Sequence, residues 1–513
     1  MFDVYQTHIT VFYEESGSLP EVYSELITKK RDQYRAILQK VLVEGQQTND
    51  FRSELPSTIV TMAIFGMINW TYKGDKQSGP LTMNEITDVF TDMILHSIVS
   101  EQAREEATQF MLHAKPVIGT GLTRLVDAKG ELGMNFELTK EQEMIRAMVR
   151  EFAEKEIKPY AREVDETSTM RLESFKKMAE LGLMGIPFPE EYGGSGGDTI
   201  SYAIAVEEIG RACGGTGLSY AAAISLGAAP IYHFGTEEQK REWLVPLAKG
   251  ETLGAFGLTE PNAGSDAGGT RTTAVIDGDE YVINGEKCWI TNAGHARQII
   301  VTAVTGKRED GKKIISSIIV PTNTKGVTIN CNYDKMGVRG SNTCEIVLQN
   351  VRVPRANLLG DEKRGFSQFL NTLDGGRISI AALSVGIAQA AYEKALQFAK
   401  EREQFGVSIS KFQAIQFKLA DMAMEIELAR TLVHKAAWLK DQKKAFGKEA
   451  AMAKLFASEM GFRTCNQAIQ IHGGSGYMKE YDVERHLRDI KLMEIGEGTS
   501  EIQRLVISRL IGC

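Results

Sequence analysis

The spacing of hydrophobic positions divides the chain into helical and strand-forming regions. Apolar residues recur at helical spacing over residues 19–45, which end at Gly45, and over residues 138–166, where Thr139 is a candidate N-cap followed by acidic residues. Residues 255–355 are instead rich in Val, Ile and Thr, and helical spacing returns after them. This order of helix, strand and helix contains no strand–helix alternation, so a doubly wound nucleotide-binding fold is not expected.

The strand-forming region carries two hairpin signals, Asp277-Gly278 and Asn284-Gly285. They predict an antiparallel sheet or a small barrel, and the long apolar run over residues 378–405 predicts a helical bundle after it. We therefore expect a helical segment, a linker, a helical domain, a β domain and a C-terminal helical bundle over residues 1–100, 101–133, 134–250, 251–360 and 361–513.

Length and composition limit the possible classes of protein. A chain of 513 residues is too long for one ordinary core, which predicts two to four domains. The net charge of -8 argues against nucleic-acid binding. No basic-then-apolar signal opens the chain, and the apolar stretches over residues 57–70 and 218–232 are too short or too polar to span a bilayer. We expect a cytoplasmic protein.

The cysteines and histidines give no metal-binding pattern. The six cysteines are scattered without a C-x-x-C pair, and the eight histidines form no H-x-x-x-H or H-E-x-x-H spacing. We therefore predict no metal site and no disulfide framework, with the cysteines as free, buried thiols.

Two motifs of the β region can bind a ligand or serve only the fold. In "AFGLTEPNAGSDAGG" (residues 255–269), small residues follow a predicted strand and let backbone amides approach a phosphate, but a tight turn explains them equally well. In "GEKCWITNAG" (residues 285–294), Trp289 and Thr291 leave a predicted hairpin, where a tryptophan usually belongs to the core.

Three motifs of the C-terminal region have the same ambiguity. In "REQFG" (residues 402–406), Arg402 can fork onto a phosphate or lie on a solvated helix face. The break "QIHGGSGY" (residues 470–477) can be a simple helix–helix turn. In "KLMEIGEGTSEIQ" (residues 491–503), glycines flank Glu497 and would let another molecule approach the backbone, although a charged surface loop is the plainer reading.

The order and spacing of these motifs resemble the acyl-CoA dehydrogenase family. "LTEPNAGSD" is similar to the first signature of the family, and "QIHGGSGYMKEYDVERHLRD" followed by "EGTSEIQR" is similar to the second; the resemblance covers residues 134–513. It implies a mainly α fold with a β-barrel middle domain and a C-terminal four-helix bundle, assembled as a homotetramer of paired dimers, with FAD as cofactor.

The resemblance also implies site residues, position by position. FAD would contact Leu258, Thr259, Ser265, Trp289 and Thr291 of one subunit, with Thr499 and Glu501 near its adenosine part. The neighbouring subunit would add Arg402, Phe405, Gln413, Gln470, Gly473 and Gly474. The acyl-CoA substrate would contact Ser265, Asp374, Arg377, Gly498 and Arg509.

In this family the residue before G-T-S is the base that removes the α-proton of the thioester, which here is Glu497. A free Glu has a pKa of about 4.3, which makes it too weak a base to remove a proton from carbon. We therefore expect desolvation to raise the pKa of Glu497. Some relatives carry the base on a bundle helix beside a D-x-x-R motif, but here that motif is "DGGR" (residues 374–377) and offers no such carboxylate. Many relatives have Tyr before the base where this chain has Gly496, which leaves the acyl chain length open.

The first hundred residues resemble the ligand-binding C-terminal half of TetR-type regulators, without the helix-turn-helix; an unrelated helical extension is the alternative. They hold 8 basic and 13 acidic residues, which is unsuited to DNA. Residues 129–131, Lys-Gly-Glu, are encoded by a purine-rich tract two codons before Met134, similar to a bacterial ribosome-binding site. We therefore expect residues 1–133 to derive from a neighbouring regulator gene joined by fusion or frameshift.

The leading interpretation is an FAD-dependent enzyme of fatty acid metabolism that desaturates a short- to medium-chain acyl-CoA, straight or branched, in β-oxidation and passes electrons to an electron-transferring flavoprotein. Two alternatives remain open. An acyl-CoA oxidase would share the fold but reduce oxygen, and a non-catalytic acyl-CoA-sensing fusion protein would lack flavin. The acyl group itself is not fixed by the sequence.

Overall fold

The computed structural model describes residues 137–513 and, before them, only short pieces between residues 36 and 61. The chain divides into two compact units, Met1–Leu132 and Gly133–Cys513. The predicted linker 101–133 and most of the segment 1–100 lie outside the described residues. In the first unit a helix that includes residues 39–47 passes through Gly45, so the predicted stop at Gly45 is wrong. The helix ends at Gln47, and the hydroxyl of the next residue, Thr48, donates to the carbonyl of Glu44 (3.2 Å).

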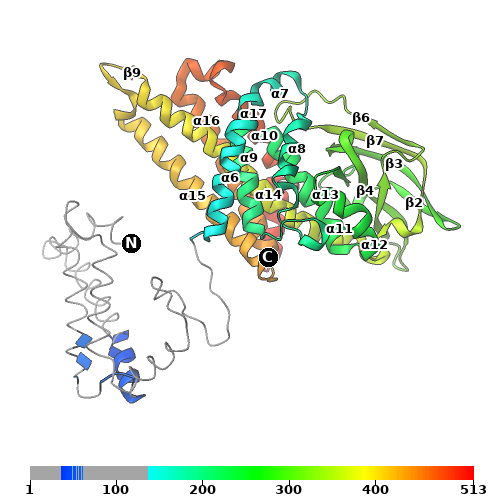
Figure 1. Ribbon diagram of the computed structural model, residues 1–513, viewed down its shortest axis with the longest axis horizontal. Helices are drawn as coiled ribbons and strands as arrows, with labels where there is room; N and C mark the ends of the chain where they lie inside the picture. The colour runs from blue at the N-terminus through cyan, green and yellow to red at the C-terminus, as the bar shows by residue number, and fades with distance from the viewer. Residues whose placement is uncertain are drawn as a thin grey trace. The chain divides into compact units, whose positions relative to one another are not determined.

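The first part of the second unit is helical, as predicted (Figure 1). Thr139 forms a capping box at the start of the first of these helices, because its hydroxyl accepts the amide of Gln142 and the side chain of Gln142 accepts the amide of Thr139. The helices are α6 (Lys140–Glu156), α7 (Ala161–Thr167), α8 (Leu172–Glu180), α9 (Thr199–Ala212), α10 (Gly214–Ala222), α11 (Ala229–Phe234), α12 (Glu237–Gln239) and α13 (Val245–Ala248).

The middle part is an eight-stranded sheet with the strand order β6-β7-β3-β2-β4-β5-β8, in which β1 also pairs with β4. The strands are β1 (Leu253–Gly257), β2 (Thr273–Asp277), β3 (Glu280–Thr291), β4 (Ala296–Lys307), β5 (Lys313–Pro321), β6 (Val327–Asn330), β7 (Thr343–Pro354) and β8 (Leu358–Leu359). Two pairs, β1 with β4 and β2 with β4, are parallel, so the sheet is not purely antiparallel as predicted. The prediction of a mainly helical fold with a β middle domain is confirmed.

Only one of the two predicted hairpin turns is a turn. Gly278 and Asp279 connect β2 to β3, and Gly278 has a left-handed φ of 62°. Asn284-Gly285 lies inside β3, where the register to β7 shifts between Ile283 and Gly285. A Cβ at Gly285 would overlap Thr272, so this glycine marks a bulge with close backbone approach.

The C-terminal part is a bundle of long helices, with a small hairpin at its tip (Figure 1). Helix α14 contains 37 residues and is mostly buried between α9 and the other bundle helices. Small residues allow this, since a Cβ at Gly386 of α14 would overlap the carbonyl of Glu207 in α9. The elements are α14 (Gly365–Glu401), β9 (Glu403–Gln404), β10 (Val407–Ser408), α15 (Gln413–Asp441), α16 (Gly447–His472), α17 (Val483–Ile490) and α18 (Ser500–Leu510).

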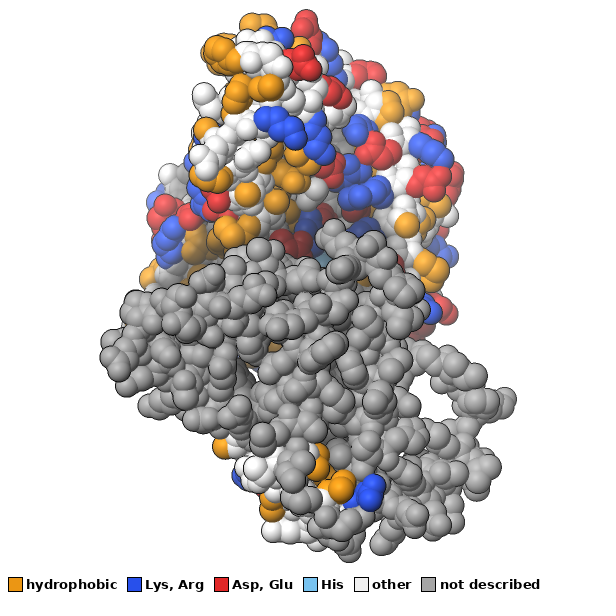
Figure 2. Space-filling model, turned by 90° about the vertical axis from the view of Figure 1, so that its left-hand side faces the viewer, with side chains coloured by type: hydrophobic (Ala, Val, Ile, Leu, Met, Phe, Trp, Pro, Cys, Tyr) orange, Lys and Arg blue, Asp and Glu red, His pale blue; other side chains and the backbone are white. Residues whose placement is uncertain are grey.

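The surface is consistent with the charge balance of the sequence. On the face drawn in Figure 2, acidic and basic side chains are interspersed with apolar ones over the coloured residues. Among the helices that the structure describes, none combines the length and apolar character that crossing a membrane requires.

The boundary between the two units leads to a first prediction. A fragment of residues 134–513 should fold alone, because its core is formed within the second unit. Circular dichroism should show one cooperative thermal transition for the fragment at the temperature of the corresponding transition in the full chain. A fragment that is insoluble, or that unfolds without a cooperative transition, would show that the first unit is needed for folding.

Candidate active site

Glu497 lies in the turn between α17 and α18 with its carboxylate directed at α14. Its Oε2 atom is buried and, within the described residues, has no hydrogen-bond partner. A Cβ built on Gly376 of α14 would overlap this oxygen. Helix α14 therefore leaves room for the carboxylate because residue 376 has no side chain.

The turn that carries Glu497 is strained and is held from behind. Glu497 has a left-handed φ of 52°, which is uncommon for a residue with a Cβ, and Gly498 follows with a φ of 95°. The Nζ atom of Lys454 donates to the carbonyl of Gly498 (2.6 Å). Gln503 Nε2 donates to the carbonyls of Gly498 (2.9 Å) and Glu497 (3.2 Å). These bonds fix the backbone of the turn from which the carboxylate extends.

The surroundings of Glu497 change its acidity. Burial raises the pKa of Glu497 to about 7, while the positive charges of Lys454 and Arg377 act in the opposite direction. A carboxyl group with a pKa near neutrality can both take up and release a proton under ordinary conditions, which suits a general base.

The residues of the D-x-x-R motif lie on the same part of α14. Arg377 is buried and forms an ion pair with Asp374 one helical turn earlier. Its Nε atom is buried and, among the described residues, has no hydrogen-bond partner. Burial raises the pKa of Asp374, against the charge of Arg377. Arg509 is exposed near the end of α18.

A second group of predicted residues meets beside strand β3. The amide of Cys288 donates to the carbonyl of Thr259 (2.9 Å), which sets the loop after β1 against the strand that carries Trp289 and Thr291. Trp289 has a left-handed φ of 58° and is 61% exposed, so it is not a core residue. The structure thus sets the loop with Leu258 and Thr259 against the strand that carries Trp289 and Thr291.

The loop after β1 is anchored by a buried ion pair that the sequence did not reveal. Lys287 Nζ donates to Glu260 Oε1 (2.7 Å) and to the carbonyl of Leu258 (3.0 Å). Glu260 in turn accepts the amides of Arg271 (2.6 Å) and Thr272 (3.0 Å). Although burial raises it, the pKa of Glu260 is lowered to about 2 by Lys287. Beyond this anchor Gly264 and Ser265 are exposed, and a Cβ at Gly264 would have no heavy atom within 4 Å.

A third group lies at the tip of the bundle. Phe405 has a left-handed φ of 54° and is 96% exposed. The ring of Phe398 in α14 stacks on His472 of α16 with centroids 4.3 Å apart, which places the end of α14 beside the end of α16. The predicted residues at this tip are exposed in the single chain: Arg402, Phe405, Gln413, Gln470, Gly473 and Gly474.

The tip is remote from Glu497. Lys454, which holds the Glu497 turn, and His472, beside the tip, both belong to α16. At 1.5 Å per residue they are about 27 Å apart along the helix axis. The other two predicted residues, Thr499 and Glu501, lie near Glu497, where Thr499 caps α18 by accepting the amide of Ile502 (3.3 Å).

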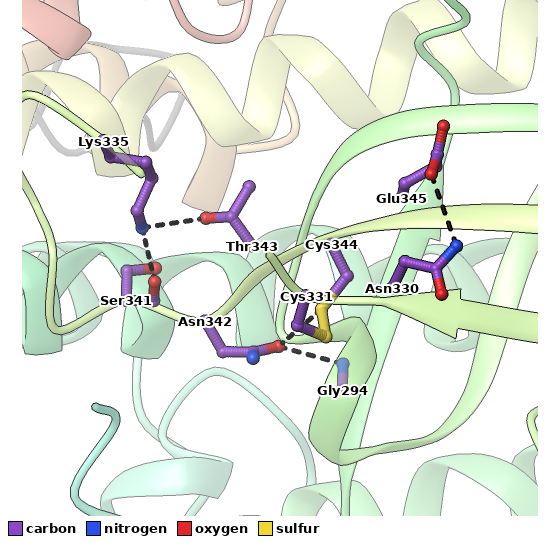
Figure 3. The surroundings of a disulfide bond; sticks show 9 residues. All are labelled: Gly294, Asn330, Cys331, Lys335, Ser341, Asn342, Thr343, Cys344 and Glu345. Carbon is purple, nitrogen blue, oxygen red and sulfur yellow. Dashed lines mark hydrogen bonds between the residues drawn. A yellow bond between two sulfur atoms is a disulfide. The ribbon is translucent and has the colours of Figure 1, made fainter. Parts of the chain in front are cut away.

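The cysteine prediction needs one correction, because Cys331 and Cys344 form a disulfide with Cα atoms 4.1 Å apart (Figure 3). The antiparallel register pairs Asn330 of β6 with Glu345 of β7, which sets the two cysteines opposite each other. In the same view, Asn342 Oδ1 accepts the amide of Gly294 (2.9 Å), next to the strand end that carries Thr291. The buried thiols that remain free are Cys213, Cys288 and Cys465; Cys513 is free and exposed.

Three parts of the chain match models of one protein family. Residues 139–251, 255–351 and 363–512 match the acyl-CoA dehydrogenase N-terminal, middle and C-terminal domains. Residues 1–98 match the tetracyclin repressor-like C-terminal domain.

Individual proteins agree with these matches. The chain is 75% identical over 376 residues to "Probable acyl-CoA dehydrogenase YngJ" of Bacillus subtilis, covering 73% of this chain and 99% of that protein. The structure of butyryl-CoA dehydrogenase from Megasphaera elsdenii superposes with a TM-score of 0.72 at 46% identity, covering 74% of this chain and 100% of the other. An acyl-CoA dehydrogenase complexed with FAD from Bacillus anthracis gives a TM-score of 0.69 at 36% identity, covering 73% of this chain and 67% of the other.

The fold consists of a helical domain, a β domain and a helical bundle. It sets a buried carboxylate in one turn and an open, amide-rich loop beside a tryptophan. Together these features define a flavin-dependent oxidoreductase. The chain belongs to the acyl-CoA dehydrogenase family. Its cofactor is FAD, and the residues fit it, because the exposed Trp289 offers an aromatic face and the open loop around Gly264 offers amides to a phosphate.

The roles of four residues at this site were not apparent from the sequence: Gly376 makes room for the carboxylate, Lys454 holds its turn, and Glu260 and Lys287 form the buried ion pair. The signal for Lys454 was a lysine among the small residues of "AAMAKLFA" (residues 450–457), a face that is otherwise apolar. Periodicity alone does not tell a buried lysine from one that extends to solvent.

The contact between Glu497 and Gly376 leads to a second prediction. Gly376→Ala should fold, because alanine favours a helix by roughly 0.5–1 kcal/mol over glycine, but it should displace the carboxylate and lower kcat roughly 10²-fold. Gly375→Ala is the matched control, since its Cβ would meet only Lys440 Nζ at 3.5 Å, an ordinary contact. Equal kcat values for the two variants with an acyl-CoA substrate would contradict this account of the site.

Proposed function

We propose that the chain converts a short- to medium-chain acyl-CoA to its trans-2-enoyl-CoA, with Glu497 removing the α-proton. The observation that carries this proposal is the Glu497 carboxylate, whose Oε2 is buried without a partner and whose pKa burial raises to about 7. A carboxylate removed from water, with no hydrogen bond to this oxygen among the described residues, is a stronger base than a solvated one.

The residues around Glu497 have separate roles in this reaction. The turn held by Lys454 and Gln503 keeps the carboxylate directed at α14, so that the proton passes to Oε2. The backbone amide of Glu497 would donate to the thioester oxygen and so acidify the α-carbon. Bound FAD supplies a two-electron acceptor for the hydrogen that leaves the β-carbon with its electron pair.

Two regions would hold the cofactor. Leu258, Thr259 and Ser265 would contact the flavin and its pyrophosphate through the loop that Glu260 and Lys287 anchor, and Trp289 and Thr291 would line the ring. Thr499 and Glu501, at the start of α18, would lie near its adenosine part. For the substrate, the pair Asp374–Arg377, together with Ser265, Gly498 and Arg509, would contact the acyl-CoA.

The tip of the bundle would complete the site of a second copy of the chain. Arg402, Phe405, Gln413, Gln470, Gly473 and Gly474 are exposed and lie at the far end of α16 from the Glu497 turn, so they are better placed to contact a cofactor held by a partner. A homotetramer of paired dimers would supply such partners. Arginine and exposed amides suit the diphosphate.

A short acyl chain is favoured by the similarity to butyryl-CoA dehydrogenase, and electron-transferring flavoprotein is the proposed acceptor. A screen of acyl-CoA chain lengths with an artificial electron acceptor tests the first point. Peroxide released during turnover would identify an oxidase instead, because the reduced cofactor would then pass electrons to oxygen.

The matched relative from Bacillus subtilis is covered over 99% of its length by 376 residues, which favours a reaction independent of residues 1–133.

The role of Glu497 gives a third prediction. Glu497→Gln should retain FAD but lose dehydrogenation by several orders of magnitude, more than the roughly 10²–10⁴ of general base catalysis alone. Glu459→Gln is the control, because that carboxylate pairs with Arg504 on an exposed face and should leave the rate unchanged. The rate of flavin reduction is measured by rapid mixing with substrate, with the loss of flavin absorbance as the signal. Flavin reduction at a near-normal rate in Glu497→Gln would disprove the assignment.

The partner contact gives a fourth prediction. Arg402→Ala should lower both the FAD content and the stability of the dimer, because one side chain serves both. Arg402→Lys should rescue them only in part, since lysine lacks the two-pronged fork of arginine. Flavin absorbance per chain and analytical ultracentrifugation measure the two effects. A monomeric Arg402→Ala protein with full flavin content would refute the shared contact.

A further inference from the structure

Lys454 is a buried cation directly behind the turn that carries Glu497. It is 0% exposed and belongs to α16, where its neighbours Ala450, Ala453 and Ala457 are also fully buried. Lysine is almost never fully buried unless it is paired, because removing an ammonium group from water is costly. A reason for its presence must therefore lie in what the ammonium group does there.

The hydrogen bond of Lys454 goes to the backbone of the turn. Nζ donates to the carbonyl of Gly498 at 2.6 Å, and Gln503 donates to the same carbonyl at 2.9 Å. The oxygen has two lone pairs and accepts both bonds. Gln503 alone already bonds the carbonyls of both Gly498 and Glu497. With a neutral side chain at position 454, the turn would therefore still be held by Gln503.

The charge of Lys454 is the feature that Gln503 does not supply. Burial lowers the pKa of Lys454 to about 8, and the negative charge of Glu497 opposes this, so the group remains a cation at neutral pH. The ionisable groups that interact with this pair include Tyr202 of α9, Arg377 of α14, Glu494 before α18 and Glu501 in α18. Arg377, the other cation, is ion-paired with Asp374, whereas Lys454 bonds a carbonyl.

We infer that Lys454 is a positioning residue that fixes the Glu497 turn through the Gly498 carbonyl and, through its positive charge, sets the pH at which the Glu497 carboxylate becomes ionised. This inference rests on the proposed role of Glu497 as the base. The sign follows from electrostatics: a nearby cation favours the ionised carboxylate. Without Lys454, burial would act with less opposition, and less of the enzyme would carry an ionised base at neutral pH.

The test compares three substitutions at position 454 with a control on the same helix. Lys454→Met and Lys454→Gln remove the charge, and Lys454→Arg keeps it. Lys448→Met removes a half-exposed lysine that pairs with Glu449, and serves as the control. For each holoenzyme, kcat/KM is measured from roughly pH 5.5 to 9, the range in which such a group titrates. The carboxyl titration of Glu497 is followed separately in the substrate-free protein by infrared difference spectroscopy, with Glu497→Gln as the reference.

The charge-removing variants should shift the midpoint of both titrations upward by about one pH unit, which is roughly a tenfold loss of kcat/KM below the midpoint, with recovery at high pH. Lys454→Arg should keep the midpoint close to that of the parent enzyme. An unchanged midpoint in Lys454→Met or in Lys454→Gln, with the rate lowered equally at every pH, would overturn the inference. The infrared titration separates this result from a failure of the proposed function, because it reports on Glu497 whether or not Glu497 is the base.

Discussion

The close packing of helix α14 is the constraint on which the second unit depends. This helix of 37 residues is buried among α9, α15 and α16, and most of its middle is formed by small or apolar residues. Gly386 allows the carbonyl of Glu207 to approach, and Gly210 of α9 gives room to Leu383. Because α14 cannot move without disturbing three neighbours, Gly376, Arg377 and Asp374 are presented from a rigid element, which is what a reactive site requires.

Two buried lysines have similar structural roles on either side of the site. Lys287 bonds Glu260 and the carbonyl of Leu258, and so fixes the loop after β1. Lys454 bonds the carbonyl of Gly498, and so holds the turn that carries Glu497. The first is neutralised by its own carboxylate, whereas the second bonds only backbone. Because of that difference, Lys287 only anchors its loop, whereas the positive charge of Lys454 is left to act on Glu497.

The sequence was sufficient for much of this description. Helical spacing and the Thr139 cap predicted the helices, and the order of the motifs predicted the family and its fold. The sequence was insufficient where the outcome depends on distant strands or on single backbone angles. Asn284-Gly285 has the composition of a turn but is a bulge, because β3 continues to pair with β7. Cys331 and Cys344 become partners only through the register of β6 with β7.

The candidate site shows the same limit. The flanking glycines singled out Glu497, but its environment depends on α14 and α16, which are far from it in sequence. The motif "DGGR" shows only that residue 376 is no carboxylate, and Lys454 belongs to no motif, since a lysine on a helix is ordinary. Their importance is visible only when the chain is folded, because each acts on Glu497 through space.

The contact between Gly376 and Glu497 means that the proposed site of proton removal is a point in space and not a position in the chain. A side chain attached at residue 376 would occupy the volume that the Glu497 carboxylate fills now. A carboxylate could therefore reach that volume either from the helix or from the turn, provided that the other position is small. Within one backbone, the base is free to migrate between two distant codons during evolution while the reacting carbon stays where it is.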